Sequence, residues 1–138
     1  MSGPSPEESG EARRWLGQAD EELTVARILA ADDRAPARAA CFHAHLAAEK
    51  AIKALLIHRA IVVPKSHDLP GLGQLLPEND QDRLETRDLQ ALDPWTVEGR
   101  YPADLGDLAA DRVQQLVQAA ARVVDAVRLA ASLDRPQP

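Results

Sequence analysis

The sequence predicts an all-α protein, an up-and-down antiparallel four-helix bundle with a short extra helix. Three observations favour this fold class. Aromatic residues make up only 3% of the 138 residues, and a core built from Ala and Leu suits packed helices better than stacked sheets. Apolar residues recur in long segments with the period of a helix. Most of these segments are joined by short connections, and the chain length suits a single domain.

The first helix is expected from about Glu11 to Ala31. The ten residues before it are rich in Gly, Pro and Ser, which is typical of a disordered tail. Within the helix, one stripe of residues follows helical spacing: Trp15, Leu16, Ala19, Leu23, Ala26 and Ala30.

The central helix is expected from about Pro36 to Ala60, because residues 41–59 contain no Gly or Pro and Pro36 suits a first helical position. One wide face is apolar and small, so a neighbouring helix can approach closely. Its residues are Ala40, Cys41, Ala44, Ala47, Ala48, Ala51, Ile52, Ala54 and Leu55.

The opposite face of this helix is also largely apolar. It carries Phe42, Leu46 and Ile57, with Glu49 and Lys53 among them. A helix with two apolar faces is either central in its own fold or shared with a second chain, so these five residues are the predicted dimer interface. Glu49 and Lys53 have the spacing of a helical ion pair, and a solvated pair is the alternative for them.

The rest of the chain completes the bundle. Pro64 favours an extended crossover, and residues 66–77 predict a loop with one or two short helical turns, capped by Ser66 or Asp68. A third helix is expected from about Gln81 to Leu92. Residues 93–106 are irregular, and the last helix is expected from about Asp107 to Leu133. The predicted domain therefore spans residues 11–134, followed by a tail at 135–138.

Composition limits the classes of function. The formal net charge is −6, which argues against broad binding to nucleic acid but leaves room for a local basic pocket. No apolar run is long enough for a membrane span, and the N-terminus does not have the pattern of a signal peptide. Cys41 is the only cysteine, which excludes an internal disulfide. We expect a cytoplasmic protein.

Three stretches together resemble the HEPN domain family in its short, stand-alone prokaryotic form. They are AAEKAIKALL at 47–56, PKSHDL at 64–69 and GRYP at 99–102, and the opening WLGQADEELTVARIL at 15–29 adds to them. The resemblance extends from about Arg14 to Leu133. It implies a helical bundle, usually a homodimer, often encoded beside a minimal nucleotidyltransferase as a toxin–antitoxin-like pair. It also implies either nucleotide binding or metal-independent ribonuclease activity.

Ribonucleases of this family use an Arg followed a few residues later by a His in the C-terminal half, and this sequence departs from that pattern. No His follows Arg100, and the four histidines are His43, His45, His58 and His67. Arg38 and His43 have a similar spacing, but they lie on the central helix, where we interpret the match as a coincidence. Whether the protein is an enzyme therefore stays open.

The candidate catalytic residues are His67 and Arg100. His67 lies in a polar loop, where a His serves as a base, a phosphate ligand or a structural anchor. Arg100 suits a phosphate and Tyr101 can stack on a base, although Arg100 can equally pair with an acid and Tyr101 pack against the bundle end. With Lys53, these three residues form the predicted ligand-binding set.

No metal, cofactor or nucleophile is predicted. His43 and His45 diverge on a helix, and no Gly-rich phosphate loop is present. Cys41 lies on the packing face, where a nucleophile is not expected. The preferred function is a binding and assembly protein, the partner of a minimal nucleotidyltransferase, which binds nucleotide or RNA. The alternative is a ribonuclease with a degenerate or displaced site, using Arg100 with His67 or His43.

Overall fold

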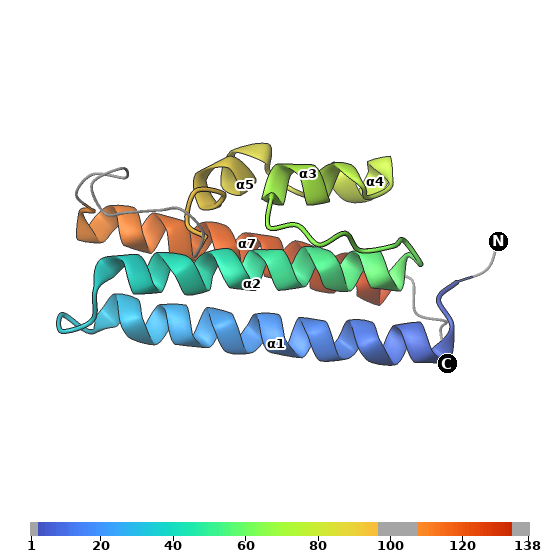
Figure 1. Ribbon diagram of the computed structural model, residues 1–138, viewed down its shortest axis with the longest axis horizontal. Coiled ribbons are helices and arrows are strands. Elements are labelled where there is room, and N and C mark those ends of the chain that lie inside the picture. Colours follow the sequence, from blue (N-terminus) through green and yellow to red (C-terminus); the bar gives the residue numbers. More distant parts are fainter. Residues whose placement is uncertain (1–2, 97–107, 134–138) are drawn as a thin grey trace.

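The computed structural model describes residues 3–96 and 108–133, and this part of the chain is all helical, without a strand. The all-α prediction is therefore confirmed. Within the described residues, three helices are long and three are short, and Figure 1 shows how they are arranged. They are α1 (Pro6–Ala31), α2 (Ala37–His58), α3 (Leu69–Gln74), α4 (Glu78–Gln81), α5 (Thr86–Leu92) and α7 (Ala110–Leu133).

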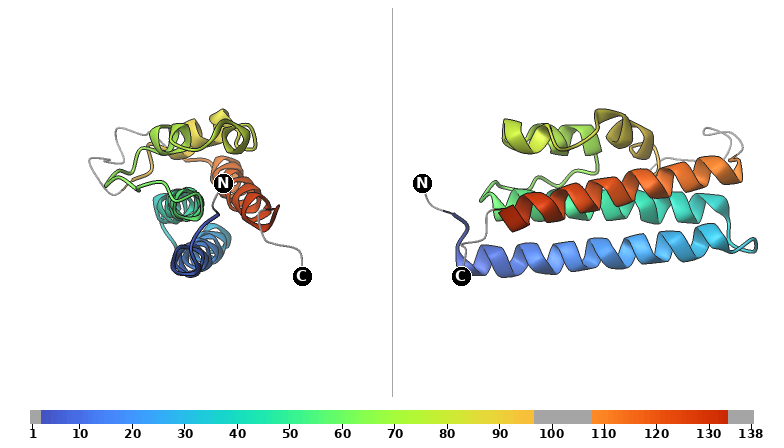
Figure 2. Two further views of the ribbon diagram at one scale, coloured as in Figure 1. Left: turned by 90° about the vertical axis from the view of Figure 1, so that its right-hand side faces the viewer. Right: turned by 180° about the vertical axis from the view of Figure 1, so that it is seen from behind.

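The central helix of the bundle is α2. It lies antiparallel to α1 and runs in the same direction as α7, because α3, α4 and α5 carry the chain back between them (Figures 1 and 2). In the end-on view of Figure 2, α2 lies between α1 and the short helices, with α7 beside it. The short helices thus take the place of the fourth long helix of the predicted bundle.

Helix α1 begins at Pro6, earlier than the expected start at about Glu11. The Ser5 hydroxyl accepts a hydrogen bond from the Glu8 amide at 3.0 Å, and the Glu8 carboxylate accepts one from the Ser5 amide at 2.9 Å. This capping box satisfies two amides that would otherwise lack partners at the start of the helix. Residues 6–10 therefore belong to the helix and not to the tail.

Helix α2 buries the face that the sequence predicted. All nine residues of its small apolar face are at most 2% exposed, and all of them except Ala54 form one core with residues of α1, α5 and α7. The helix ends where the Ile61 amide donates to the Leu56 carbonyl and the Ala60 amide to the Ile57 carbonyl, both at 2.9 Å. Ala60 has φ of 58°, a left-handed conformation that usually belongs to Gly at this position.

The expected third helix from about Gln81 to Leu92 is wrong at its start, because α4 ends at Gln81 and α5 begins only at Thr86. A Cβ atom on Gly73 would lie 3.1 Å from Cδ1 of Leu89 and 4.0 Å from Cδ1 of Leu84. Residues five apart in an unbroken helix point about 140° away from each other. The break lets both leucines pack beside Gly73 of α3.

Two bidentate ion pairs hold the short helices in place. Arg59, at the end of α2, donates to both carboxylate oxygens of Asp80 on α4, at 2.7 and 2.8 Å. Arg122 on α7 does the same to Asp88 on α5, at 2.9 Å for both bonds. Both aspartates are buried. Helices of this length are unstable alone, so these anchors and the leucine contacts fix their position.

The ends of the remaining elements follow the prediction within the described residues. Asp68, and not Ser66, caps α3 through a hydrogen bond from the Gly71 amide at 3.1 Å. Trp95 is buried in the core. The expected start of the last helix at Asp107 lies outside the described residues, as do the end of the domain at residue 134 and the tail that follows it. No helix among the described residues is long and apolar enough to cross a membrane.

Candidate functional site

A buried carboxylate on α2, Glu49, is the centre of a cluster of hydrogen-bonded polar side chains. Its Oε1 atom accepts hydrogen bonds from Nε2 of His45 at 3.1 Å and Nδ1 of His67 at 2.9 Å. Its Oε2 atom accepts one from Nζ of Lys53 at 3.0 Å. Glu49 is 5% exposed and Lys53 is 7% exposed. We call these four residues the Glu49 cluster.

The cluster joins three segments of the chain. His45, Glu49 and Lys53 lie one turn apart along α2, so their side chains share one face. His67 comes from the connection between α2 and α3. Nδ1 of His45 lies 2.9 Å from the carbonyl oxygen of Leu92, the last residue of α5. The cluster therefore fixes both the connection and the end of α5 against the central helix.

The surroundings of Glu49 favour its ionised form. Burial by itself would raise the pKa of Glu49, but hydrogen bonds from His45, His67 and Lys53, with the charge of Lys53, outweigh it and lower the pKa to about 2. Glu49 is thus a carboxylate throughout the physiological range of pH. An ionised carboxylate only accepts hydrogen bonds, so each of its three partners donates to it.

His67 is the exposed member of the cluster. Half of its side chain is exposed, whereas that of Lys53 is 9% exposed. Because Nδ1 donates to Glu49, Nε2 is the basic nitrogen of the neutral ring, the arrangement by which a carboxylate orients a histidine base. The cluster can therefore present a base, or a cationic ring that binds an anion, while Glu49 holds the ring in position.

The structure brings together only part of the predicted ligand-binding set. Lys53 and His67 meet on Glu49, but Arg100 and Tyr101 lie outside the described residues. The alternative of a solvated Glu49–Lys53 pair is wrong, because both residues are buried and Glu49 also accepts a hydrogen bond from His67. His45 was missed as a member of the cluster. Its position four residues before Glu49, on the face that also holds Lys53, was the available signal.

A second carboxylate on the bundle has a similar pair of partners. Glu22 on α1 accepts hydrogen bonds from His43 and Lys50 of α2, both at 2.7 Å. Burial would raise its pKa, but bonds from Lys50 and His43 lower it below the usual value for Glu. This Glu22 cluster links α1 to α2, and the Nδ1 atom of His43 is hydrogen-bonded to its carboxylate. It includes none of the predicted ligand-binding residues.

Other candidate chemistries find less support in the described residues. Cys41 is fully buried, and burial raises the pKa of its thiol to about 11, so it is a packing residue and not a nucleophile. No group of three or more His, Cys, Asp and Glu in residues 3–96 and 108–133 has an arrangement that would hold a metal ion.

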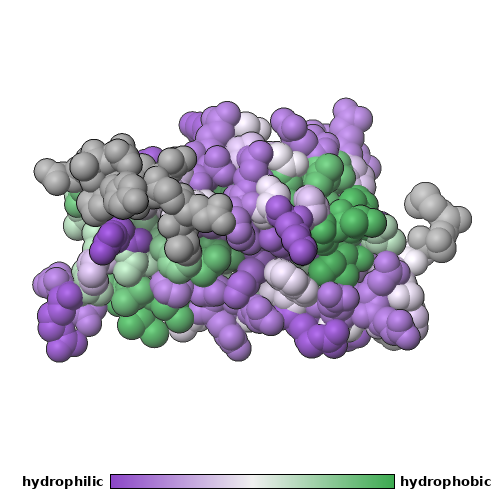
Figure 3. Space-filling view, in the orientation of Figure 1, coloured by the Kyte–Doolittle hydropathy of each residue, from purple (hydrophilic) through white to green (hydrophobic). Residues whose placement is uncertain are grey.

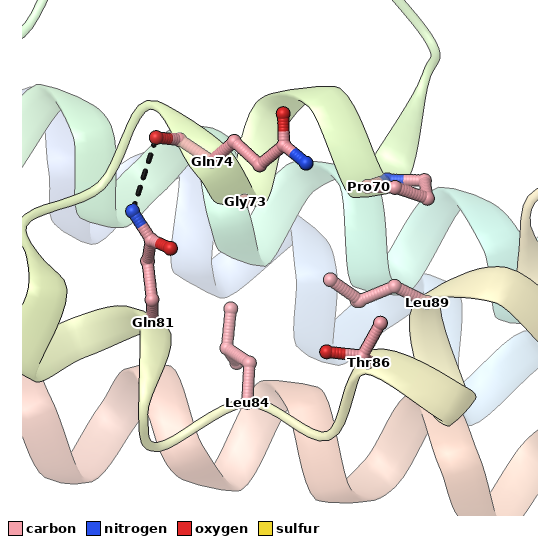
Figure 4. A pocket seen from close by; sticks show the side chains of 7 residues that line it. All are labelled: Pro70, Gly73, Gln74, Gln81, Leu84, Thr86 and Leu89. Carbon is pink, nitrogen blue, oxygen red and sulfur yellow. Dashed lines mark hydrogen bonds between the residues drawn. The ribbon is translucent and has the colours of Figure 1, made fainter.

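A hollow of about 150 Å³ lies between α3 and the segment from α4 to α5 (Figure 4). Gln81 spans one side of it, donating to the carbonyls of Gln74 at 3.1 Å and Leu76 at 2.8 Å. Its lining residues are Pro70, Gly73, Gln74, Gln81, Leu84, Thr86 and Leu89. None of them is charged, so this hollow offers an anion no ionic partner, unlike the Glu49 cluster.

The outward side of α2 keeps apolar residues at its surface. Phe42, Leu46 and Ile57 are each half-buried, and we call them the outer apolar strip. Figure 3 shows hydrophobic surface on the face that includes α2, in two areas, one of them over the end of α2 and the connection that follows it. That connection includes Val62, which is 90% exposed.

Comparison with known proteins identifies both the family of this chain and solved structures with the same fold. The family model of the HEPN domain matches residues 12–130. The chain belongs to the HEPN domain family. No curated protein matches this chain.

Two solved structures resemble this HEPN chain. TT1696 from Thermus thermophilus has a TM-score of 0.69 and 28% sequence identity, over 86% of this chain and 96% of that one. ST0689, described as an archaeal HEPN homologue, has a TM-score of 0.66 and 23% identity, over 87% of this chain and 97% of its own. The chain therefore spans nearly the whole of both structures.

Proposed function

We propose that this HEPN protein is a binding and assembly module. Two copies pair through the outer apolar strip of α2, and the dimer works in the cytoplasm as the partner of a minimal nucleotidyltransferase in a toxin–antitoxin-like pair. Nucleotide or RNA phosphate is bound at Lys53 and His67. The ligand-binding part includes Arg100 and Tyr101, as the sequence predicts.

One observation carries the assembly part of this proposal. After α2 has buried its alanine-rich face against its own chain, Phe42, Leu46 and Ile57 still form an apolar strip at the surface. Glu49 and Lys53, which the sequence included in the interface, are covered by their own chain. The interface is therefore carried by the three apolar residues, which supply the hydrophobic contact area that association needs.

Sedimentation velocity tests the pairing. In Leu46→Asp, a charge in the interface opposes association, so this variant is expected to sediment as a monomer. The matched control is Leu129→Asp, because Leu129 is 55% exposed and lies on α7, which contributes no residue to the outer apolar strip. The control is expected to remain a dimer. Equal behaviour of the two variants would refute the assignment of the interface to α2.

The partner claim is tested by co-expression. A tagged form of this chain is expected to retain a minimal nucleotidyltransferase encoded beside it through size-exclusion chromatography. Elution of the two proteins as separate peaks at micromolar concentration would refute it.

The ligand claim is tested by calorimetric titration with ATP and with a short RNA. His67→Ala is expected to weaken binding, whereas His43→Ala, which removes the histidine of the Glu22 cluster, should leave it unchanged. No heat of binding with either ligand would mean that the protein is an assembly partner without this ligand.

The Glu49–His67 contact also supports the second candidate, a ribonuclease with a displaced site. A carboxylate on Nδ1 of a half-exposed histidine is a known way to orient a general base. In this candidate, Arg100 would stabilise the charge on the phosphate. Incubation with total RNA distinguishes the two functions. Cleavage that both His67→Ala and Arg100→Ala abolish would favour the nuclease, and intact RNA with wild-type protein would exclude it.

A further inference from the structure

His45 is the most deeply buried ionisable group of the Glu49 cluster, with 1% of the residue exposed. Both of its ring nitrogens lie at hydrogen-bond distance from an oxygen. Nδ1 is 2.9 Å from the Leu92 carbonyl, and Nε2 is 3.1 Å from Oε1 of Glu49. The ring therefore lies between the end of α5 and the carboxylate of Glu49, with one nitrogen at hydrogen-bond distance from each.

Neither of these oxygens can donate a hydrogen bond. A backbone carbonyl only accepts, and so does an ionised carboxylate. In a neutral imidazole, one nitrogen carries a proton and the other carries a lone pair. A neutral His45 would therefore turn a lone pair towards an acceptor oxygen, at a position where water cannot intervene. Only a ring with a proton on each nitrogen satisfies both contacts.

We propose that His45 is held as a buried imidazolium and is the positioning residue of the Glu49 cluster. Its Nε2–H fixes one oxygen of Glu49, and the same oxygen receives Nδ1–H of His67. Its Nδ1–H donates to the Leu92 carbonyl, which fixes α2 relative to the end of α5. Loss of one proton from His45 would break one of these two contacts: either Glu49 loses one of its three donors, or the Leu92 carbonyl loses its donor and α2 is no longer fixed to the end of α5.

This assignment changes the charge of the site. Two buried positive charges, on Lys53 and His45, then face the single negative charge of Glu49. A buried excess of positive charge below a half-exposed histidine favours a phosphate group over a cation. This consequence rests on the proposed ligand-binding function, whereas the charge state of His45 does not.

The charge state is measured by long-range proton–nitrogen correlation spectra of the histidine rings in the ¹⁵N-labelled wild-type protein at pH 7. Both nitrogens of His45 are expected to show the chemical shift of a protonated nitrogen. One nitrogen with the shift of an unprotonated, pyridine-like atom would overturn the proposal. The wild-type spectrum needs no substitution, so poor folding of a variant cannot obscure this result.

The positioning role is tested by the ring spectrum of His67 in two matched variants. His45→Gln is expected to convert His67 from a ring with a fixed Nδ1–H into a mixture of tautomers. His43→Gln removes a histidine from the separate Glu22 cluster and should leave the His67 spectrum unchanged. An unchanged His67 spectrum in His45→Gln would overturn the positioning role.

Addition of inorganic phosphate and of ATP to the wild-type protein separates this inference from the proposed function. A doubly protonated His45 with no ligand-induced shift at His67 would support the charge state and refute ligand binding. A singly protonated His45 with a clear ligand-induced shift at His67 would refute the charge state and support ligand binding.

Discussion

Glu49→Gln is the substitution whose effect on stability follows most directly from the structure. Glutamine has nearly the same size and shape as glutamate but no charge, so the variant resembles the protonated form of Glu49. The folded state lowers the pKa of Glu49 from 4.5 to about 2. At 1.36 kcal/mol per unit, a shift of this size corresponds to about 3 kcal/mol of stability at pH 7.

The direction of the pH dependence follows from the sign of this shift. Because the pKa is lower in the folded state, the stabilisation is complete well above pH 4.5 and is lost as the pH falls from 4.5 towards 2. The difference between wild type and Glu49→Gln should therefore be about 3 kcal/mol at pH 7 and about 1.5 kcal/mol at pH 3. Other carboxylates titrate in both proteins and cancel in the difference.

Urea unfolding followed by circular dichroism at a series of pH values measures this difference. Glu22→Gln is the matched control, because Glu22 also has His and Lys partners but its side chain is more exposed, at 15% against 6% for Glu49. Its effect should be smaller. A difference between wild type and Glu49→Gln that stays constant from pH 7 to pH 3 would refute the reasoning.

Three further predictions concern the fold. Ala60→Gly should raise the free energy of unfolding by about 1 kcal/mol, because the left-handed conformation at φ of 58° suits Gly. The control Ala126→Gly, in the middle of α7, should lower the free energy of unfolding by a similar amount. Chemical denaturation of both variants compares the two effects. Ser5→Ala should cost about 1 kcal/mol by removing the capping box, with increased amide exchange in the first turn of α1; unchanged exchange there would contradict the assignment. Ala48→Leu should cost about 1–3 kcal/mol, because a fully buried small residue lies between packed helices; an unchanged melting temperature would show that this face is loosely packed.

The parts of the fold that depend on local periodicity could be predicted from the sequence. The alanine-rich face of α2 was correctly identified because its nine residues repeat with helical spacing, and all nine are buried. The break between α4 and α5 could not be predicted in this way. It depends on Gly73 of α3 and on the leucines that pack beside it, a contact between segments that no periodicity encodes.

In the candidate site, too, the residue types could be predicted from the sequence, whereas the contacts between distant segments could not. Lys53 and His67 were predicted to lie in one ligand-binding set and do meet on Glu49, but Glu49 itself was predicted as part of the dimer interface. The helical ion-pair spacing of Glu49 and Lys53 is the same whether the pair is exposed or buried, so the burial of Glu49 depends on tertiary contacts such as the one with His67. The role of His45 depends on the Leu92 carbonyl, which is far away in sequence. The start of α1, in contrast, could have been predicted from the sequence, because Ser5 and Glu8 have the spacing of a capping box.

The pairing of two chains through the outer apolar strip of α2 is the central claim of this account, and the mass of the wild-type protein in solution tests it most directly. Light scattering after size-exclusion chromatography should give twice the 15.0 kDa of one chain at tens of micromolar. A single species with the mass of one chain at that concentration would contradict it.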